Sequence, residues 1–207
     1  MARKYELKRR AERQRETRQR IVEATVTLHM EGGAANATVS AIARRAGVER
    51  PTVYRHFPDE RTLFSACTGH YLSVNPPPDP APWALIDDAE GRLRAGLTAI
   101  YAFFHRVEPM LASLAHDLYN ASPALLDALA PYFAYWDRVR TVLAEPWIGQ
   151  GADCALARAA VGHAIDFQSW RSLVRQQGLD DTHVVDLMAA MLRGACAVGT
   201  TPKVDVS

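Results

Sequence analysis

Cationic, hydroxyl and aromatic side chains gather in one short stretch of the sequence, Arg50-Pro-Thr-Val-Tyr-Arg-His56. An arginine can donate two parallel hydrogen bonds to O6 and N7 of a guanine. Threonine, tyrosine and histidine side chains can hold phosphate oxygens. On a helix short enough to enter a major groove about 12 Å wide, such groups predict contact with DNA. The residues available for this contact are Arg50, Thr52, Tyr54, Arg55 and His56.

Two short helices and a tight turn must position these residues. Thr38 is a good N-cap for a helix over residues 39–46. Gly47 ends that helix, because glycine adopts a positive φ without steric cost. A second helix is expected over residues 50–57, where Pro51 is tolerated in the first turn. The pattern indicates a helix-turn-helix.

Small and apolar residues allow the two helices to pack at a steep angle. Ala43 and Ala46 permit close approach of the backbones, and the shared apolar wedge consists of Ile42, Val48 and Val53. A unit this small cannot bury enough apolar surface alone. It is expected to pack against a long first helix over residues 4–31 and a fourth helix from Asp59 to Tyr71. An ordinary helical hairpin with a solvated face is the alternative. It does not explain why a turn glycine, small packing residues and a basic, aromatic exposed face occur together at this spacing.

The stretch from Gly47 to Phe57 resembles the recognition helix of the tetracycline-repressor (TetR) family, and the resemblance extends over residues 17–71. It implies an all-α protein with an N-terminal three-helix helix-turn-helix domain and a C-terminal helical domain for ligand binding and dimerisation. We therefore expect a DNA-binding domain over residues 1–60 and a regulatory and dimerisation domain over residues 61–207.

The resemblance also implies roles for single residues. Arg50 and Pro51 occupy positions that read base edges, Pro51 through apolar contact with a thymine methyl group. Positions that touch phosphates or a neighbouring base are held by Thr52, Tyr54 and His56. Thr38 and Ser40 begin the preceding helix, where backbone amides and hydroxyls meet a phosphate.

Two features depart from the family pattern. Glu60 stands where many members carry a lysine that holds a phosphate, and its carboxylate would repel one; Arg61 is the alternative donor. The basic arm over residues 1–17 is also unusually rich in charge, since residues 1–20 hold nine lysines and arginines. The arm either lies along the DNA backbone or a minor groove, or forms a solvated helical extension.

Charge is distributed unevenly along the chain. Residues 1–71 hold 14 Lys and Arg against 8 Asp and Glu, whereas residues 72–207 hold 10 against 15. A basic first third followed by an acidic remainder indicates two parts with different partners, the first of them polyanionic. A chance fluctuation with a solvated basic helix would give the same asymmetry.

Beyond a stiff, proline-rich connector at residues 75–82, apolar residues recur at helical spacing and no alternating β pattern of useful length occurs. The expected helices cover residues 84–106, 109–119, 123–145 (bent or broken at Pro131), 152–177 and 180–198. The sequence therefore predicts an all-α chain.

The last two of these helices carry apolar stripes and small residues. They resemble the pair through which the family dimerises, a four-helix bundle formed with the twofold mate. Alternatively, both stripes face only the core of the chain itself. The candidate dimerisation residues are Leu156, Ala160, His163, Phe167, Trp170, Met188 and Met191.

Most aromatic residues lie between the connector and that helix pair. Aromatic residues at helical spacing belong more often to a core than to a pocket. Polar residues among them, however, favour a cavity with a few orienting groups, and hence a small, mostly apolar effector. The candidate ligand-binding residues are Tyr101, Phe104, His105, Asp117, Tyr119, Phe133 and Trp136.

Several function classes lack support in the sequence. There is no P-loop, dinucleotide fingerprint, metalloprotease motif or nucleophile elbow, so neither an enzyme nor a cofactor is expected. The three cysteines form no CxxC pair, and no metal site is expected. Without an apolar span or a signal-peptide core, we expect a cytoplasmic protein.

The most economical interpretation is a homodimeric repressor that binds double-stranded DNA at a palindromic operator and is released by a small-molecule effector. A helix-turn-helix protein without small-molecule control is the first alternative. A small helical enzyme with an incidental helix-turn-helix is the second.

Overall fold

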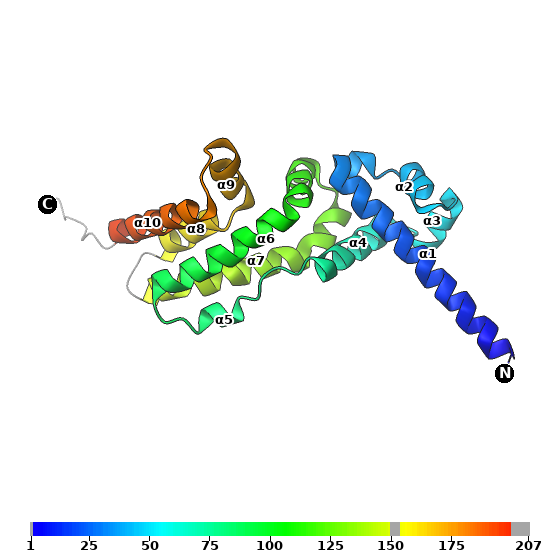
Figure 1. The fold of residues 1–207 in the computed structure, drawn as a ribbon, viewed down its shortest axis with the longest axis horizontal. Coiled ribbons are helices and arrows are strands. Elements are labelled where there is room, and N and C mark those ends of the chain that lie inside the picture. Colours follow the sequence, from blue (N-terminus) through cyan, green and yellow to red (C-terminus); the bar gives the residue numbers. More distant parts are fainter. Residues whose placement is uncertain (1, 150–153, 200–207) are drawn as a thin grey trace. The chain divides into compact units, whose positions relative to one another are not determined.

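The computed structural model describes the backbone of residues 2–149 and 154–199, and all regular elements within these ranges are helical (Figure 1). The expected all-α fold class is therefore confirmed. The first residue of the basic arm and residues 152–153 of an expected helix lie outside the described residues. The chain divides into two compact units.

Unit 1 contains the chain up to Pro76 together with Val107–Pro131. Its elements are α1 (Ala2–Gly32), the 3₁₀ turn η1 (Ala34–Asn36), α2 (Val39–Ala46), α3 (Arg50–His56), α4 (Glu60–Val74), the second half of α6 (Ala89–Asp117), the 3₁₀ turn η2 (Leu118–Asn120) and the start of α7 (Pro123–Gly149). The expected domain boundary after residue 60 stays a prediction.

Unit 2 contains Pro77–Arg106 and the chain from Tyr132 onward. Its elements are α5 (Ala81–Ala84), the first half of α6, the remainder of α7, α8 (Cys154–Ala164), α9 (Phe167–Arg171), the π-helical turn η3 (Ser172–Gln176) and α10 (Asp181–Gly199).

The main core of unit 1 lies where α1 crosses the helix-turn-helix. From Tyr5 to Glu16, α1 is exposed, and full burial begins at Ile21, which is 0% exposed. The polar Thr25 is buried in this core, and its hydroxyl donates to the carbonyl of Ile21 (2.8 Å), so no polar group is stranded. The buried cluster consists of Ile21, Val22, Ala24, Ile42, Ala43, Ala46, Val53, Phe57 and Leu63.

A second cluster joins α4 to the second half of α6 and the start of α7. Leu114, Leu125 and Leu129 are buried together, and Phe64 of α4 packs against them. This cluster explains why unit 1 is discontinuous in sequence, since Phe64 of α4 packs on residues that come between about 50 and 65 positions later.

Unit 2 is built around the proximal half of α6. The hydroxyl of Tyr101 donates to the carbonyl of Ala164 (2.9 Å), which ties α6 to the end of α8. Arg92 is buried, and its guanidinium donates to the carbonyls of Ile86 (2.8 Å), Ala84 (3.1 Å) and Val142 (3.2 Å). A buried charge is tolerated there because its donors are satisfied.

Two expected helix boundaries were wrong. The helices expected over residues 84–106 and 109–119 form one helix that continues through Pro109. At Pro131, where a bend or a break was expected, α7 is not broken. A proline removes one backbone hydrogen bond, but buried residues on both sides keep each helix packed. Conversely, the helix expected over residues 152–177 is interrupted, because Asp166 accepts from the backbone N–H of Ser169 (2.7 Å) and caps a new helix, α9.

Candidate nucleic-acid interface

Local hydrogen bonds fix the turn between α2 and α3. The hydroxyl of Thr38 accepts from the backbone N–H of Ala41 (3.2 Å), as expected for an N-cap. Gly47 adopts φ 65° and ψ 41°, a left-handed conformation that favours glycine. The N–H of Val48 then donates to the carbonyl of Ala43 (3.0 Å), which closes the helix end. The angle between α2 and α3 is thus set by backbone geometry and core packing.

Helix α3 has one buried face, formed by Val53 together with the following residue Phe57. The six candidate residues of α3 occupy the remaining faces: Arg50, Pro51, Tyr54 and Arg55 are exposed, and Thr52 and His56 are half-buried. Thr38 and Ser40, at the start of α2, are exposed as well. The structure therefore brings the candidate DNA-contacting residues to the surface of one rigid unit.

His56 lies beside two arginines at the end of α3. Its partial burial is the main cause that lowers the pKa of the imidazole, and the positive charges of Arg55 and Arg18 lower this pKa further. The guanidinium of Arg18 lies over the Phe57 ring, 4.5 Å from its centre. His56 is therefore neutral near pH 7, with one ring nitrogen able to donate and the other able to accept.

The structure weakens the expectation that Arg61 replaces Glu60 as a phosphate donor. The guanidinium of Arg61 forms an ion pair with Asp127 of α7 (2.5 Å), so its charge is already partly compensated. Glu60 itself is exposed in the first turn of α4. Asp59 caps this helix as expected, accepting from the backbone N–H of Thr62 (2.7 Å).

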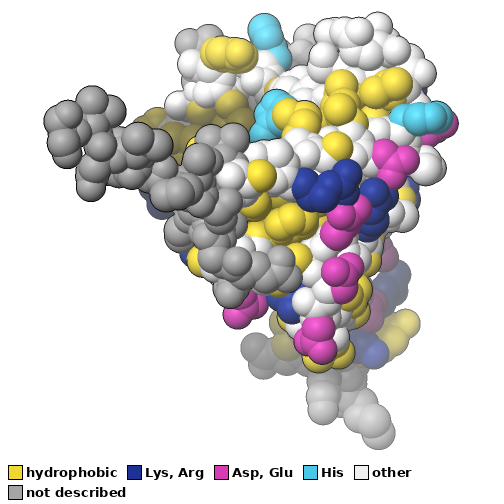
Figure 2. Space-filling view, turned by 90° about the vertical axis from the view of Figure 1, so that its left-hand side faces the viewer, with side chains coloured by type: hydrophobic (Ala, Val, Ile, Leu, Met, Phe, Trp, Pro, Cys, Tyr) yellow, Lys and Arg dark blue, Asp and Glu magenta, His cyan; other side chains and the backbone are white. Residues whose placement is uncertain are grey.

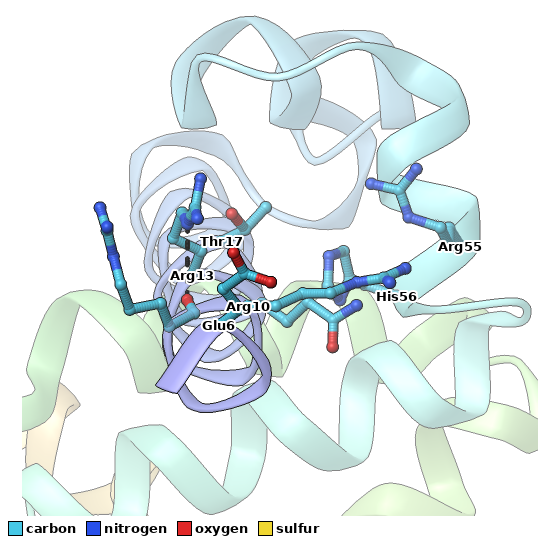
Figure 3. Close-up of a pocket in the computed structure, with 8 residues that line it drawn as sticks. Glu6, Arg10, Arg13, Thr17, Arg55 and His56 are labelled. Carbon is cyan, nitrogen blue, oxygen red and sulfur yellow. Dashed lines mark hydrogen bonds between the residues drawn. The ribbon is translucent and has the colours of Figure 1, made fainter. Parts of the chain in front are cut away.

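A groove of about 750 Å³ lies between the N-terminal half of α1 and the end of α3, a feature that sequence reasoning missed. Figure 3 shows the α1 side chains on one side of it and the two α3 side chains on the other. We call this feature the basic groove. It is lined by Glu6, Arg9, Arg10, Arg13, Gln14, Thr17, Arg55 and His56. The α1 members recur at helical spacing and so share one face of that helix.

The family model for "Bacterial regulatory proteins, tetR family" matches residues 21–67, the part of the chain that contains this helix-turn-helix and its supporting core. This part of the chain is thus similar to the DNA-binding domain of tetR-family regulators.

Individual relatives agree with this assignment. An HTH-type transcriptional regulator of Mycobacterium bovis is 45% identical over 56 residues, 27% of this chain and 30% of that protein, so the match spans under a third of the relative. The HTH-type transcriptional repressor KstR of Mycobacterium tuberculosis is 27% identical over 95% of this chain and 81% of its own. The fold resembles a TetR-like regulator from Rhodococcus sp. RHA1 (TM-score 0.60, 18% identity, covering 87% and 96% of the two chains).

The candidate ligand-binding residues fall into two groups. Tyr101, Phe104, His105, Phe133 and Trp136 belong to unit 2. Tyr101 and Phe104 are fully buried, and the Phe104 and Trp136 rings lie 5.7 Å apart between centroids. His105 is exposed, and its Nε2 lies 3.0 Å from a carboxylate oxygen of Asp181.

The other two candidates, Asp117 and Tyr119, lie in unit 1. Tyr119 is 89% exposed. Asp117 is engaged within the unit, because its Oδ2 lies 2.6 Å from Nε2 of His29 and accepts from the backbone N–H of Ala34 (3.0 Å). The hydroxyl of Ser113 also donates to the carbonyl of His29 (2.8 Å). These contacts tie the end of α6 to the end of α1 and to η1.

The candidate dimerisation residues differ in exposure. Trp170 and Met188 are buried in the core of unit 2, and Ala160 and Phe167 are half-buried. The exposed members are Leu156, His163 and Met191. Leu187, on the same apolar stripe of α10, is 38% exposed. The molecule's end at α10, viewed in Figure 2, presents hydrophobic side chains among charged ones.

Other chemistry is limited in the part of the chain that the structure describes. No group of three or more His, Cys, Asp or Glu side chains there could hold a metal ion. No described helix is long and apolar enough to cross a membrane. Cys67 and Cys196 are free thiols, and burial raises the pKa of Cys67 to about 12, which makes that thiol a poor nucleophile.

Proposed function

We propose that the chain is a transcription regulator that binds a palindromic DNA operator as a homodimer, and that a small, mostly apolar molecule releases it. The observation that carries the DNA-binding proposal is the two-sidedness of α3. Val53 fixes its inner face in the core, while Arg50, Tyr54 and Arg55 extend from its outer faces. Twofold symmetry would place two such helices in successive major grooves, about 34–36 Å apart.

Selection of duplexes from a random library with the full-length chain tests this proposal. The selected duplex should bind with strong salt dependence, because phosphate contacts release counterions. Arg50→Ala should weaken specific binding by about 1–3 kcal/mol and relax the preference at one base position per half-site. Arg138→Ala, an exposed arginine of unit 2, is the matched control and should leave binding unchanged. Equal losses on selected and random DNA would show that Arg50 only holds phosphate.

The proposed dimer uses the outward faces of α8 and α10. Their exposed apolar side chains include Leu187 and Met191, which lie one helical turn apart on α10. Replacing both with glutamate should give monomers in sedimentation, with much weaker operator affinity because each half-site would be bound alone. An unchanged sedimentation coefficient would contradict this interface.

The proposed effector site lies in unit 2 around Phe104, Trp136 and His105. The Phe104 and Trp136 rings pack against each other, and the His105 ring packs against Trp170. A ligand would therefore have to displace a side chain, and Phe133, which is 41% exposed and packs against Tyr132, is a candidate. The same packing favours the alternative of a regulator without small-molecule control. A thermal-shift screen of apolar compounds, followed by operator binding with each hit, separates the two: saturating hits that leave operator affinity unchanged would favour the alternative.

A further inference from the structure

We propose that the basic groove binds phosphates of the DNA backbone that flank the base pairs read by α3. This inference rests on the proposed function and extends it to a second contact site outside the helix-turn-helix. It assigns a role to Arg10 and Arg13 of the arm, and it places them opposite Arg55 and His56.

Position supports this assignment. Arg50 begins α3 and His56 ends it, about 9 Å further along the helix axis at 1.5 Å per residue. The groove therefore begins about 9 Å from the residue proposed to meet the bases, less than the roughly 12 Å width of a major groove. The α1 residues from Glu6 to Thr17 extend the groove by about 16 Å, enough to follow several phosphates of one strand.

The groove is also chemically suited to phosphate. Its lining offers four guanidinium groups, a hydroxyl, an amide and an imidazole against a single carboxylate, that of Glu6. Arginine donates to phosphate oxygens in a fork geometry, and threonine, glutamine and histidine side chains can donate as well. Surrounding one carboxylate with four cations leaves a net positive site that attracts a polyanion.

The groove arginines differ from other arginines of the chain in whether they form ion pairs with carboxylates. Among the described residues, Arg10, Arg13 and Arg55 have no carboxylate within ion-pair distance; Arg55 donates to Thr52 (3.4 Å) and Arg13 to the carbonyl of Arg9 (3.4 Å). Ion pairs are formed instead by Arg45, Arg61, Arg92, Arg94, Arg140 and Arg193. The groove thus concentrates cations whose counter-charge has to come from outside the chain.

The salt dependence of DNA binding provides the first test, with the full-length chain and the duplex selected by the wild type. The variant Arg10→Gln/Arg13→Gln removes two groove cations and keeps good helix formers. The control Lys8→Gln/Arg15→Gln removes two cations from the same helix outside the groove. Each lost phosphate contact lowers the salt slope by about 0.9, so wild-type affinity should fall roughly 12-fold more than that of the groove variant between 50 and 200 mM salt.

Charge neutralisation on both partners provides the second test. Methylphosphonates at the flanking phosphates should weaken wild-type binding and leave the groove variant unaffected, because its contacts are already lost. Glu6→Gln should tighten binding more than Glu16→Gln, a carboxylate on the same helix outside the groove.

The outcomes separate this inference from the function on which it rests. A wild-type chain that selects no duplex would contradict the proposed function itself. Operator binding with equal salt slopes for the groove variant and its control would refute the groove alone. Weakening of both proteins by methylphosphonates would also refute it, because those phosphates would then be bound elsewhere.

Discussion

Asp117 holds unit 1 together at the end of α6, and its replacement by alanine should destabilise that unit. The carboxylate accepts from the backbone N–H of Ala34 and lies 2.6 Å from Nε2 of His29, and its side chain is 11% exposed. A hydrogen bond to a charged group contributes about 1.5–3 kcal/mol, and a buried donor left without an acceptor costs about 1–3 kcal/mol. Two such bonds, partly replaced by water at this edge, give an expected loss of about 2–4 kcal/mol.

The assay must report on unit 1 separately. All four tryptophans (Trp83, Trp136, Trp147 and Trp170) belong to unit 2, so their fluorescence follows unit 2. Hydrogen exchange of the α1–α4 amides follows unit 1 instead. With a urea m-value of about 2 kcal/mol/M, the midpoint for unit 1 should fall by roughly 1–2 M.

His116→Ala is the matched control, because His116 is the exposed neighbour of Asp117 on the same helix turn. It should leave the unit 1 midpoint in place. A shift below about 0.25 M for Asp117→Ala, equivalent to about 0.5 kcal/mol, would refute the argument and show that water replaces the carboxylate fully.

Three further predictions follow from the packing and charges of the described residues. Trp170→Ala should cost about 3–5 kcal/mol in urea unfolding and leave the oligomeric state unchanged, since the side chain is 0% exposed; monomers of unaltered stability would contradict its place in the core. Arg92→Met should cost about 2–4 kcal/mol, measured the same way, because three carbonyls lose their donor; a neutral effect would mean that water satisfies them. Burial, Arg55 and Arg18 lower the pKa of His56 in the free chain, and a bound phosphate would raise it, so operator affinity should increase as pH falls from about 7.5 to about 6. His56→Gln should remove this pH dependence, and an equal dependence in that variant would assign it to another group.

The helix-turn-helix could be predicted in detail from the sequence, because its determinants are local. Thr38 caps a helix through an atom three residues away, and Gly47 supplies the left-handed turn by its own backbone freedom. Val53 and Phe57 mark the inner face of α3 by helical spacing alone. Such features need no knowledge of distant neighbours.

The basic groove and the role of Asp117 depend on distant neighbours and could not be predicted in this way. Asp117 contacts His29, which lies 88 positions earlier in the sequence, and the residue spacing in either segment does not predict this contact. Likewise, the stripe containing Trp170 was apolar as predicted, but periodicity does not tell whether its own chain or a partner covers it. Here the Phe104 ring covers Trp170, with 5.5 Å between the ring centroids.

The discontinuity of unit 1 has a consequence for the chain during its synthesis. Phe64 leaves the ribosome well before Leu114, Leu125 and Leu129, the residues against which it packs. At about 5–20 residues per second, the roughly 55 residues from Pro76 to Pro131 take about 3–11 s to translate. For that interval the nascent helix α4 lacks the residues that Phe64 packs against. Chains that terminate early should therefore be more susceptible to proteolysis than the full-length chain.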